Sequence, residues 1–369
     1  MKRHLVVLVC VLAAVVVLLP VSAPAAPTAT VAMSGLDNPR GLAFAPDGSL
    51  YVAEAGKGGT GQCLFLRGQN QCVGATGAIS RLRDGVQERV VTGLPSYAPQ
   101  PAGGGAIGPH DVAFRGDTGY ATIGLAAESD PVAARLILGQ GFGWVIRFKP
   151  DGRWAFFADI GSYESANNPD GGVKDSNPYG LLNRGGRLLM TDAGGNDLLG
   201  IAANAAISTV AVFPSRVNGR STEAVPTAVT VGPDGAYYVS ELTGFPFAPG
   251  AARVYRVVPG QAPQVYCSGF TDLIDLQFAP DGSLYVLEYA TGPFLSGPGA
   301  ILRVAPDCSR TTVYDALTHP TSLLLQTRHG EDDEDDEDQG GNRGNGVEAI
   351  YVSNLGDQAL VGQVLRVQP

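Results

Sequence analysis

The chain has 369 residues, of which 44% are hydrophobic and 16% charged, and its formal net charge is −10. Eight acidic residues form one run at 331–338, and without this run the net charge is −2, so the rest of the chain is nearly neutral. The sequence has no cluster of basic residues that could attract the phosphates of a nucleic acid, so nucleic-acid binding is excluded as the function. Fifty glycines and 26 prolines are spread along the length, which favours an all-β fold with many short strands.

The N-terminal residues 1–25 have the pattern of a signal peptide. A short basic segment at 2–4 precedes an uninterrupted apolar run at 5–19, and Ala23-Pro24-Ala25 is a plausible cleavage site. The apolar run is short for a membrane span, which needs about 20 residues. We therefore expect a secreted or periplasmic protein with no membrane span after cleavage; an uncleaved anchor is the alternative.

One phrase then recurs six times along the chain. It consists of an apolar strand that usually opens on proline, a turn that reads Pro-Asp-Gly in its clearest copies, and a second apolar strand that usually carries tyrosine. The copies begin at residues 38, 108, 177, 225, 272 and 319. Glycine in the Asp-Gly turns accepts the positive φ that tight hairpins require.

A second hairpin follows the phrase, as at 77–94 and 251–270, so each unit supplies four strands. Four antiparallel strands repeated radially predict a six-bladed β-propeller over residues 30–369. The chain ends on QVLRVQP, which matches a third strand, whereas TVAMSGL at 30–36 matches the fourth strands. We expect this N-terminal strand to complete the last blade and close the ring, leaving no exposed sheet edge there.

The first and second strands of a blade are antiparallel, so the start of the first and the end of the second lie on one face, called the top face. The turn between them lies on the bottom face. In five of the six blades the second strand ends on a polar residue, and in blade 2 Ile123 takes this position. The polar residues are Glu54, Asp192, Glu241, Glu288 and Asn354. Oxygen ligands in this arrangement suit Ca²⁺. The alternative is that these side chains accept backbone N–H groups from adjoining loops and hold no metal.

The starts of the first strands line the mouth of the central channel in this topology. They contribute the candidate ligand-binding residues Arg40, His110, Asp111, Tyr179 and Asp275. His110 and Asp111 are also the candidates for acid–base catalysis, because a histidine titrates near neutral pH. The alternative for His110 is a hydrogen-bonded core residue. The sequence identifies no nucleophile.

Two pairs of cysteines remain after removal of the predicted signal peptide. Cys63 and Cys72 lie in one insertion after the second strand of blade 1, and we expect a disulfide between them in an oxidising compartment. Cys267 falls toward the top of a fourth strand, whereas Cys308 falls in a bottom turn. Strand rise would separate them by roughly 10 Å or more, so we expect no bond between them.

The acidic run lies in the connection between the first two strands of blade 6, within a low-complexity insertion at about 329–346. Such a charged segment is typical of a disordered, solvated loop. Topology places it on the bottom face, away from the candidate site at the top of the channel. Weak binding of divalent cations or of a partner is the alternative.

Several phrases are similar to those of the ScyD/ScyE family of exported bacterial propellers, whose name derives from proteins associated with the biosynthesis of a sunscreen pigment. They include GLDNPRGLAFAPDGSLYVAEAGKGG, GPHDVAF, NPDGGVKDSNPYGLL and AVPTAVTVGPDGAYYVSELTGFPF. The resemblance runs from about residue 30 to the C-terminus and departs from the family in blade 6, at the acidic run. It implies an exported propeller and supplies no catalytic residues.

Three functions follow as hypotheses. The first is a monomeric scaffold that binds a small molecule or an exported protein through its top-face loops. The second is a calcium-dependent hydrolase, such as a lactonase-like enzyme, at the channel mouth. The third, which rests on the family resemblance, is an accessory role in the maturation or export of an aromatic secondary metabolite.

Overall fold

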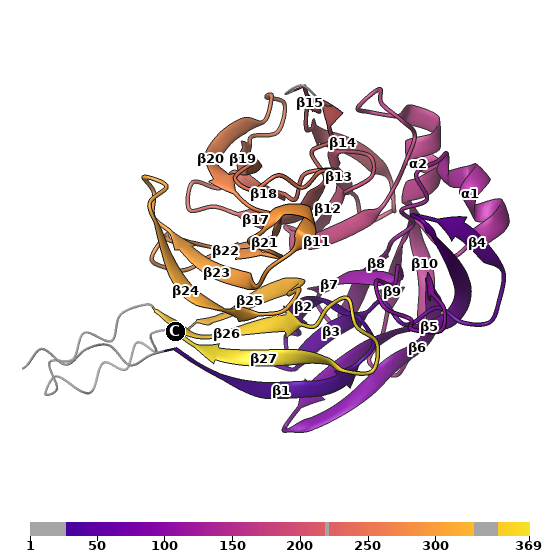
Figure 1. The fold of residues 1–369 in the computed structure, drawn as a ribbon, viewed down its shortest axis with the longest axis horizontal. Helices are drawn as coiled ribbons and strands as arrows, with labels where there is room; N and C mark the ends of the chain where they lie inside the picture. The colour runs from indigo at the N-terminus through magenta and orange to yellow at the C-terminus, as the bar shows by residue number, and fades with distance from the viewer. Residues whose placement is uncertain (1–26, 218–220, 328–345) are drawn as a thin grey trace, which may run out of the picture.

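Six four-stranded antiparallel units surround a central axis (Figure 1) in the computed structural model, which describes residues 27–217, 221–327 and 346–369. The first strand of each blade is innermost and has a neighbour on one side only. These strands are β2 (Pro39–Phe44), β7 (Pro109–Arg115), β11 (Pro178–Arg184), β17 (Pro226–Val231), β21 (Leu273–Phe278) and β25 (Ser322–Thr327).

The other strands follow outward in chain order. The second strands are β3 (Leu50–Glu54), β8 (Thr118–Ile123), β12 (Arg187–Asp192), β18 (Tyr237–Glu241), β22 (Leu284–Glu288) and β26 (Val347–Asn354). The third strands are β5 (Gln69–Arg83), β9 (Trp144–Phe148), β13 (Asp197–Ile201), β19 (Ala252–Val257), β23 (Gly299–Val304) and β27 (Gly362–Gln368). The fourth are β6 (Val86–Pro99), β10 (Trp154–Asp159), β14 (Ile207–Val212), β20 (Gln264–Phe270), β24 (Arg310–Leu317) and β1 (Thr28–Leu36). The predicted six-bladed propeller is confirmed.

Ring closure by the N-terminal strand is also confirmed. Strand β1 pairs with β27 from Thr28 opposite Gln368 to Leu36 opposite Gly362. The side chains of Met33 and Leu36 are 1% and 0% exposed, so the closing strand also supplies core. The first and the last described strands therefore belong to one blade.

The Asp-Gly turns have the geometry that the repeated phrase predicts. Gly48, Gly235 and Gly282 have φ values of 79°, 78° and 81°, a region that favours glycine. The aspartate one place earlier accepts a hydrogen bond from the backbone N–H two residues on, at 3.0 Å from Ser49 to Asp47. These turns reverse the chain within a few residues, so that the second strand of the blade runs antiparallel to the first.

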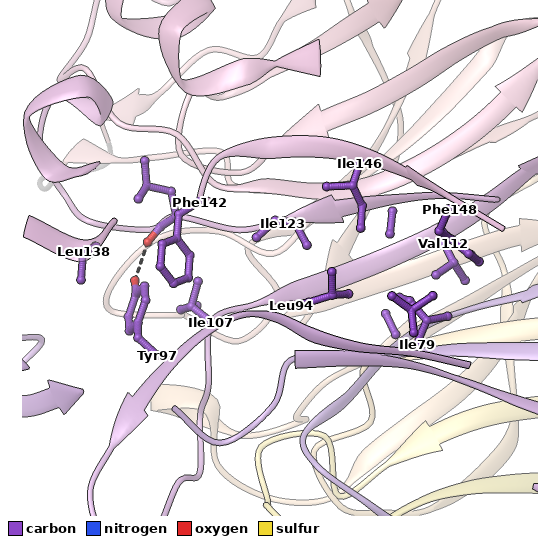
Figure 2. Close-up of a cluster of buried hydrophobic side chains, with 14 of the residues drawn as sticks. Ile79, Leu94, Tyr97, Ile107, Val112, Ile123, Leu138, Phe142, Ile146 and Phe148 are labelled. Atoms are coloured by element: carbon purple, nitrogen blue, oxygen red, sulfur yellow. Dashed lines mark hydrogen bonds between the residues drawn. The ribbon is translucent and has the colours of Figure 1, made fainter. Parts of the chain in front are cut away.

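Apolar side chains fill the space between neighbouring blades. Figure 2 shows the cluster between blades 1 and 2, where Ile79 and Leu94 face Val112 and Ile146. The phenol of Tyr97 at its edge donates a hydrogen bond to the carbonyl of Leu125. Burial of both faces of each sheet holds the blades in register around the axis.

Insertions within the described part of the chain lie in connections on the top face. They contain β4 (Cys63–Leu66), α1 (Pro131–Leu138), α2 (Ile160–Asn167), the hairpin of β15 (Arg216–Val217) and β16 (Ser221–Thr222), and the short helix η1 (Pro293–Leu295). Strand β4 pairs with β5 and places Cys63 opposite Cys72. The predicted disulfide between these two cysteines is confirmed.

The expectation for the other two cysteines is wrong, because Cys267 and Cys308 form a disulfide with their Cα atoms 5.7 Å apart. The expectation compared heights along the strands and ignored sheet twist, which inclines the outer strands across the disc. As a result the outer turn of blade 5 reaches the middle of β20. Arg310, two residues after Cys308, donates a hydrogen bond to the carbonyl of Gly269 at 2.6 Å. This disulfide links blades 4 and 5.

Two predictions fall outside the described residues: the signal peptide at 1–25 and, except for its last residue, the acidic insertion at 329–346. Strands β25 and β26, which flank that insertion, pair from Ser322 opposite Ser353 to Thr327 opposite Val347. No helix in the part of the chain that the structure describes is long and apolar enough to cross a membrane.

Candidate functional site

Five of the six innermost strands, those of blades 1–5, have a bulge where they enter the channel. In blade 1, Pro39 pairs with Glu54, and the next regular pair is Leu42 with Val52. Strand β25 of blade 6 has its register shift at the other end, between Gln326 and Thr327. One residue near the entry of each of the six strands faces the channel. These residues, two places after the opening proline in the blades that have one, are Gly41, Asp111, Gly180, Ala228, Asp275 and Ser322, and we call them the central ring.

Asp111 and Asp275 are the acidic members of the central ring and come from blades 2 and 5, which are opposite in a ring of six. Each carboxylate bridges to the next blade. Asp111 accepts the backbone N–H of Leu181 at 2.7 Å. Asp275 accepts the backbone N–H of Leu323 at 2.8 Å and the hydroxyl of Ser322 at 2.7 Å. Both predicted residues thus lie in the channel and also tie inner strands together.

The neighbouring Gly41 makes room for one of these carboxylates. A Cβ atom at Gly41 would lie 1.9 Å from Oδ1 of Asp111 and 2.6 Å from its Cα. Any side chain at position 41 would therefore displace Asp111. The glycine is required by the close approach of blades 1 and 2 at this level of the channel.

The two aspartates bind protons more tightly than ordinary carboxylates. Burial raises the pKa of Asp275 to about 6, although its hydrogen bonds favour the ionised form. Burial, and then the charge of Asp275, raise the pKa of Asp111 well above its usual range. Because the two groups repel when both are ionised, we expect the pair to carry one negative charge near neutral pH.

A cavity of about 370 Å³, which we call the lower chamber, lies between the central ring and the bottom face. Its walls are residues 42–44, 111–114, 181–183, 228–230, 275–277 and 322–325. Most are apolar, and Asn183, Thr230 and Gln277 supply polar groups. Since these residues run from the central ring toward the first turns, the chamber that the described residues form opens on the bottom face and ends on Asp111 and Asp275.

A much smaller cavity of about 20 Å³, the upper cavity, lies on the other side of the central ring. His110, Tyr179, Thr227 and Thr321 are among its lining residues. Asp111, Ala228, Asp275 and Ser322 line both cavities. The central ring therefore separates a chamber large enough for a small ligand from a space that holds about one water molecule.

His110 is 1% exposed and packs against Tyr179, with the ring centroids 4.8 Å apart and the ring planes tilted by 43°. Burial, and then the charge of Arg40, lower the pKa of His110 to about 3, so the ring is neutral. Its Nδ1–H donates to the carbonyl of Pro178 at 3.0 Å. The histidine lies beside the upper cavity and is separated from the lower chamber by the central ring.

Side chains pack over the upper cavity toward the top face. Tyr179 and Tyr289 both contact the apolar cluster that includes Ile274. The ring of Tyr289 stacks on His319 at 4.8 Å. The guanidinium of Arg40 donates to two backbone carbonyls, those of Gly356 at 2.7 Å and Ala106 at 3.0 Å. The sequence placed the candidate site at the top mouth, whereas the larger channel cavity opens on the opposite face.

The series at the ends of the second strands anchors loops. Glu54 accepts the backbone N–H of Asp37 at 2.7 Å, Asp192 that of Asn177 at 2.6 Å, Glu288 that of Thr271 at 2.8 Å, and the side-chain oxygen of Asn354 that of Thr318 at 2.7 Å. Glu241 pairs with Arg216 at 2.8 Å. Each accepted N–H belongs to the segment that leads into a first strand.

These five side chains do not form a common ligand set. Each makes its contacts within its own blade and the loop above it. Among the residues with described positions, no group of three or more His, Cys, Asp or Glu side chains is arranged to hold a metal ion. The anchoring alternative accounts for every contact just given.

Sequence reasoning missed the lower chamber. Asn183, Thr230 and Gln277 lie near the ends of first strands, where only an apolar pattern was noticed. The available signal was a polar residue at an otherwise apolar position, two places after the central ring for Thr230 and Gln277 and three places after it for Asn183. The preference for the top face came from the long insertions there, whereas the side chains that pack over the upper cavity, such as Tyr179 and Tyr289, lie at the ends of strands.

Comparisons with known proteins place this chain among the β-propellers. No protein-family model and no curated protein matches the sequence. The fold is similar to that of a putative gluconolactonase, with a TM-score of 0.52 and 12% identity over 94% of this chain and 93% of the other.

The PQQ-bound aldose sugar dehydrogenase from Streptomyces coelicolor is also similar, with a TM-score of 0.51 and 11% identity over 94% and 99% of the two chains. A streptogramin B lyase is similar as well, with a TM-score of 0.50 and 12% identity over 93% of this chain and 97% of the other. At these identities the likeness shows the fold alone.

Proposed function

We propose that this protein binds a small amphipathic molecule in the lower chamber, which the ligand enters from the bottom face. The observation that carries the proposal is the cavity of about 370 Å³ that ends on Asp111 and Asp275. Its volume lies in the range of small-molecule sites, roughly 300–1,000 Å³. Its construction from all six blades gives it a rigid wall.

The lining indicates the chemistry of the ligand. Apolar side chains such as Leu182 and Phe114 line the chamber together with polar side chains and backbone groups, which suits a small molecule with both an apolar and a polar part. The carboxyl pair at the closed end, with one negative charge, favours an amine or a hydroxyl donor and disfavours an anion. A molecule with an apolar ring and a cationic amine matches both features.

Export is part of the proposal. Two disulfides within the described residues, Cys63–Cys72 and Cys267–Cys308, are typical of proteins in oxidising compartments. The signal-peptide pattern supports the same location. We propose a secreted or periplasmic binding protein that acts as a monomer.

Two further functions remain alternatives. A calcium-dependent hydrolase would use the series of Glu54, Asp192, Glu241, Glu288 and Asn354, and requires a stoichiometric metal that is lost on changing Glu241 and Glu288. An accessory role with an aromatic secondary metabolite rests on the ScyD/ScyE resemblance. The apolar part of the chamber lining would contact an aromatic cargo, so this role is a special case of ligand binding.

The test is a calorimetric comparison of 2-phenylethylamine, 2-phenylethanol and phenylacetate, which share a ring and differ in charge. We expect the amine to bind best and phenylacetate least. Asp275→Asn should abolish the preference for the amine. Asp272→Asn, which changes a buried carboxyl outside the channel lining, is the matched control and should retain it. Binding of none of the three, or a preference unchanged by Asp275→Asn, would contradict the proposal.

A further inference from the structure

Five of the six blades have the same two side chains opposite one another in their middle strands. A tyrosine of the second strand stands opposite an arginine of the third, whereas blade 3 has Leu189 opposite Gly200. The opposed residues are Tyr51 and Arg81, Tyr120 and Arg147, Tyr238 and Arg256, Tyr285 and Arg303, and Tyr351 and Arg366. Because opposed residues point to the same face of a sheet, the five arginines hold equivalent places and can be compared.

Four of these five arginines form an ion pair with an acidic side chain of their own blade. The ion pairs are Arg81–Glu88, Arg256–Asp234, Arg303–Asp281 and Arg366–Glu348. Arg147 of blade 2 is the exception, because no carboxylate oxygen of the described residues lies within 4.0 Å of its guanidinium. Its positive charge is therefore not compensated by the part of the chain that the structure describes.

The sequence of blade 2 explains this exception. In blades 4 and 5 the acid belongs to the first turn, four places before the tyrosine, and blade 2 has Gly116 there. In blade 1 the acid stands opposite the arginine on the fourth strand, and blade 2 has Ala155 there. Asp117 corresponds to Glu348 of blade 6, but within the described residues it forms no ion pair. Blade 2 has thus kept the arginine without its partner.

Arg147 lines a pocket of about 420 Å³, which we call the blade 2 pocket. Its walls also include Thr118, Tyr120, Lys149, Arg153 and Trp154. These residues come from the start of β8, the end of β9 and the start of β10, so the pocket lies on the outer strands near the bottom face. None of them lines the lower chamber. The volume lies in the range of small-molecule sites, roughly 300–1,000 Å³.

The blade 2 pocket holds a second uncompensated cation. Lys149 follows Arg147 by two residues on β9, which places both side chains on one face of the sheet. Its Nζ donates to two neutral oxygens, the hydroxyl of Thr118 at 2.8 Å and the carbonyl of Asp117 at 3.3 Å. Among the described residues no carboxylate lies within 4.0 Å of Nζ. Arg153 differs, because it pairs with Asp151 at 2.6 Å.

Apolar groups form the rest of the wall beside these cations. Ala155 lies opposite Arg147 on β10 and is exposed, and Trp154 next to it is half-buried. On the other side of Arg147, Tyr120 is 3% exposed, and its hydroxyl accepts a hydrogen bond from Arg115. The pocket therefore offers two free positive charges next to a small apolar surface.

We propose that the blade 2 pocket binds a small phosphate monoester through Arg147 and Lys149. The second pKa of a phosphate monoester is about 6, so the group carries nearly two negative charges at neutral pH and matches the two cations. A guanidinium donates two parallel N–H groups to phosphate oxygens, and an ammonium group adds a point charge. The organic part of the ester would contact Ala155 and Trp154. This site is separate from the proposed site in the lower chamber, whose carboxyl pair disfavours anions.

The test is calorimetric titration of the purified protein with phenyl phosphate, phenyl sulfate and inorganic phosphate. Phenyl sulfate has nearly the shape of phenyl phosphate but one negative charge, and inorganic phosphate lacks the ring. We expect phenyl phosphate to bind at least tenfold more tightly than either. Arg147→Gln and Lys149→Gln change exposed side chains, so each should weaken phenyl phosphate binding at least tenfold and leave the melting temperature unchanged.

Arg256→Gln is the matched control. Arg256 holds the place of Arg147 in blade 4 but is paired with Asp234 at 2.6 Å, so phenyl phosphate should bind this variant as it binds the wild type. The proposal is overturned if the wild type does not bind phenyl phosphate, or if Arg147→Gln binds it equally well. Equal affinities for phenyl phosphate and phenyl sulfate would contradict the requirement for two charges. Equal affinities for phenyl phosphate and inorganic phosphate would contradict the assignment of an ester.

Discussion

At the scale of single residues, buried carboxylates act mainly on the backbone around them. Glu54 shows this most clearly, because it is 0% exposed and accepts hydrogen bonds from Asp37 and from the hydroxyl of Ser80. Arg89 supplies the compensating charge at 2.6 Å. The same side chain that the sequence suggested as a metal ligand thus ties the loop before β2 to β5 and β6 of the same blade.

The variant Glu54→Ala should lower the free energy of unfolding by about 2–4 kcal/mol, because it leaves the backbone N–H of Asp37 and the hydroxyl of Ser80 buried without their acceptor. Urea unfolding monitored by tryptophan fluorescence measures this loss. Glu348→Ala is the control, since its pair with Arg366 is longer, at 3.5 Å, and partly exposed. That change should cost no more than about 1 kcal/mol. Equal losses in the two variants would show that Glu54 does not have the anchoring role.

At the scale of elements, different pairs of neighbouring blades are held together by different kinds of contact. Blades 1 and 2 share a large apolar cluster, as Figure 2 shows, and blade 6 is closed by β1. Blades 4 and 5 have in addition a covalent link from β20 to the turn before β24. The two disulfides therefore differ in what they hold: Cys63–Cys72 staples one hairpin, whereas Cys267–Cys308 joins neighbouring blades.

Loss of the inter-blade disulfide should destabilise the protein more than loss of the hairpin disulfide. The sequence separations are 41 and 9 residues. Loop-closure entropy then gives about 4 kcal/mol for the longer loop and about 2.6 kcal/mol for the shorter. Paired serine substitutions at each disulfide, compared by denaturant unfolding, measure the difference. Peptide mapping without reductant must also find Cys267 joined to Cys308, and free thiols at both positions would refute the assignment.

At the scale of the whole molecule, the architecture was predictable and the direction of the channel was not. The repeated turns, such as the one at Gly48, predict the number of blades. The match of 30–36 to the outer strands predicts the ring closure. They are local patterns with a fixed geometry. The position of Cys308 beside β20 depends on accumulated twist between blades, and the open end of the channel depends on how Tyr179 and Tyr289 pack. The sequence of a single repeat predicts neither the twist between blades nor the packing of these tyrosines.

The molecule as a whole should be more stable in mild acid than in mild alkali. Carboxyl groups with raised pKa values, at about 6 for Asp275, about 7 for Asp175, Glu241 and Asp272, and about 8 for Glu164, bind protons more tightly folded than unfolded. Their contribution is complete below their unfolded pKa near 4 and is lost as the pH rises through 6–8.

Carboxyl groups with lowered pKa values, such as Asp159, act in the opposite direction below about pH 4. The free energy of unfolding in chelator should therefore be greatest near pH 5 and fall by a few kcal/mol at pH 8. Urea midpoints across this range measure the change. A midpoint that rises from pH 5 to pH 8 would mean that these carboxyl groups are ionised without penalty in the folded protein.

The central claim is that the channel admits a ligand from the bottom face and is closed above the central ring. The four cysteines of the described chain are in disulfides, so an introduced cysteine is the free thiol to follow. Thr230 lines the lower chamber, and Thr227, three residues earlier on the same strand, lines the upper cavity and is 1% exposed. The decisive measurement is the rate at which a methanethiosulfonate reagent modifies Thr230→Cys and Thr227→Cys in the folded protein. The account predicts rapid modification of Thr230→Cys and protection of Thr227→Cys, and the reverse order would contradict it.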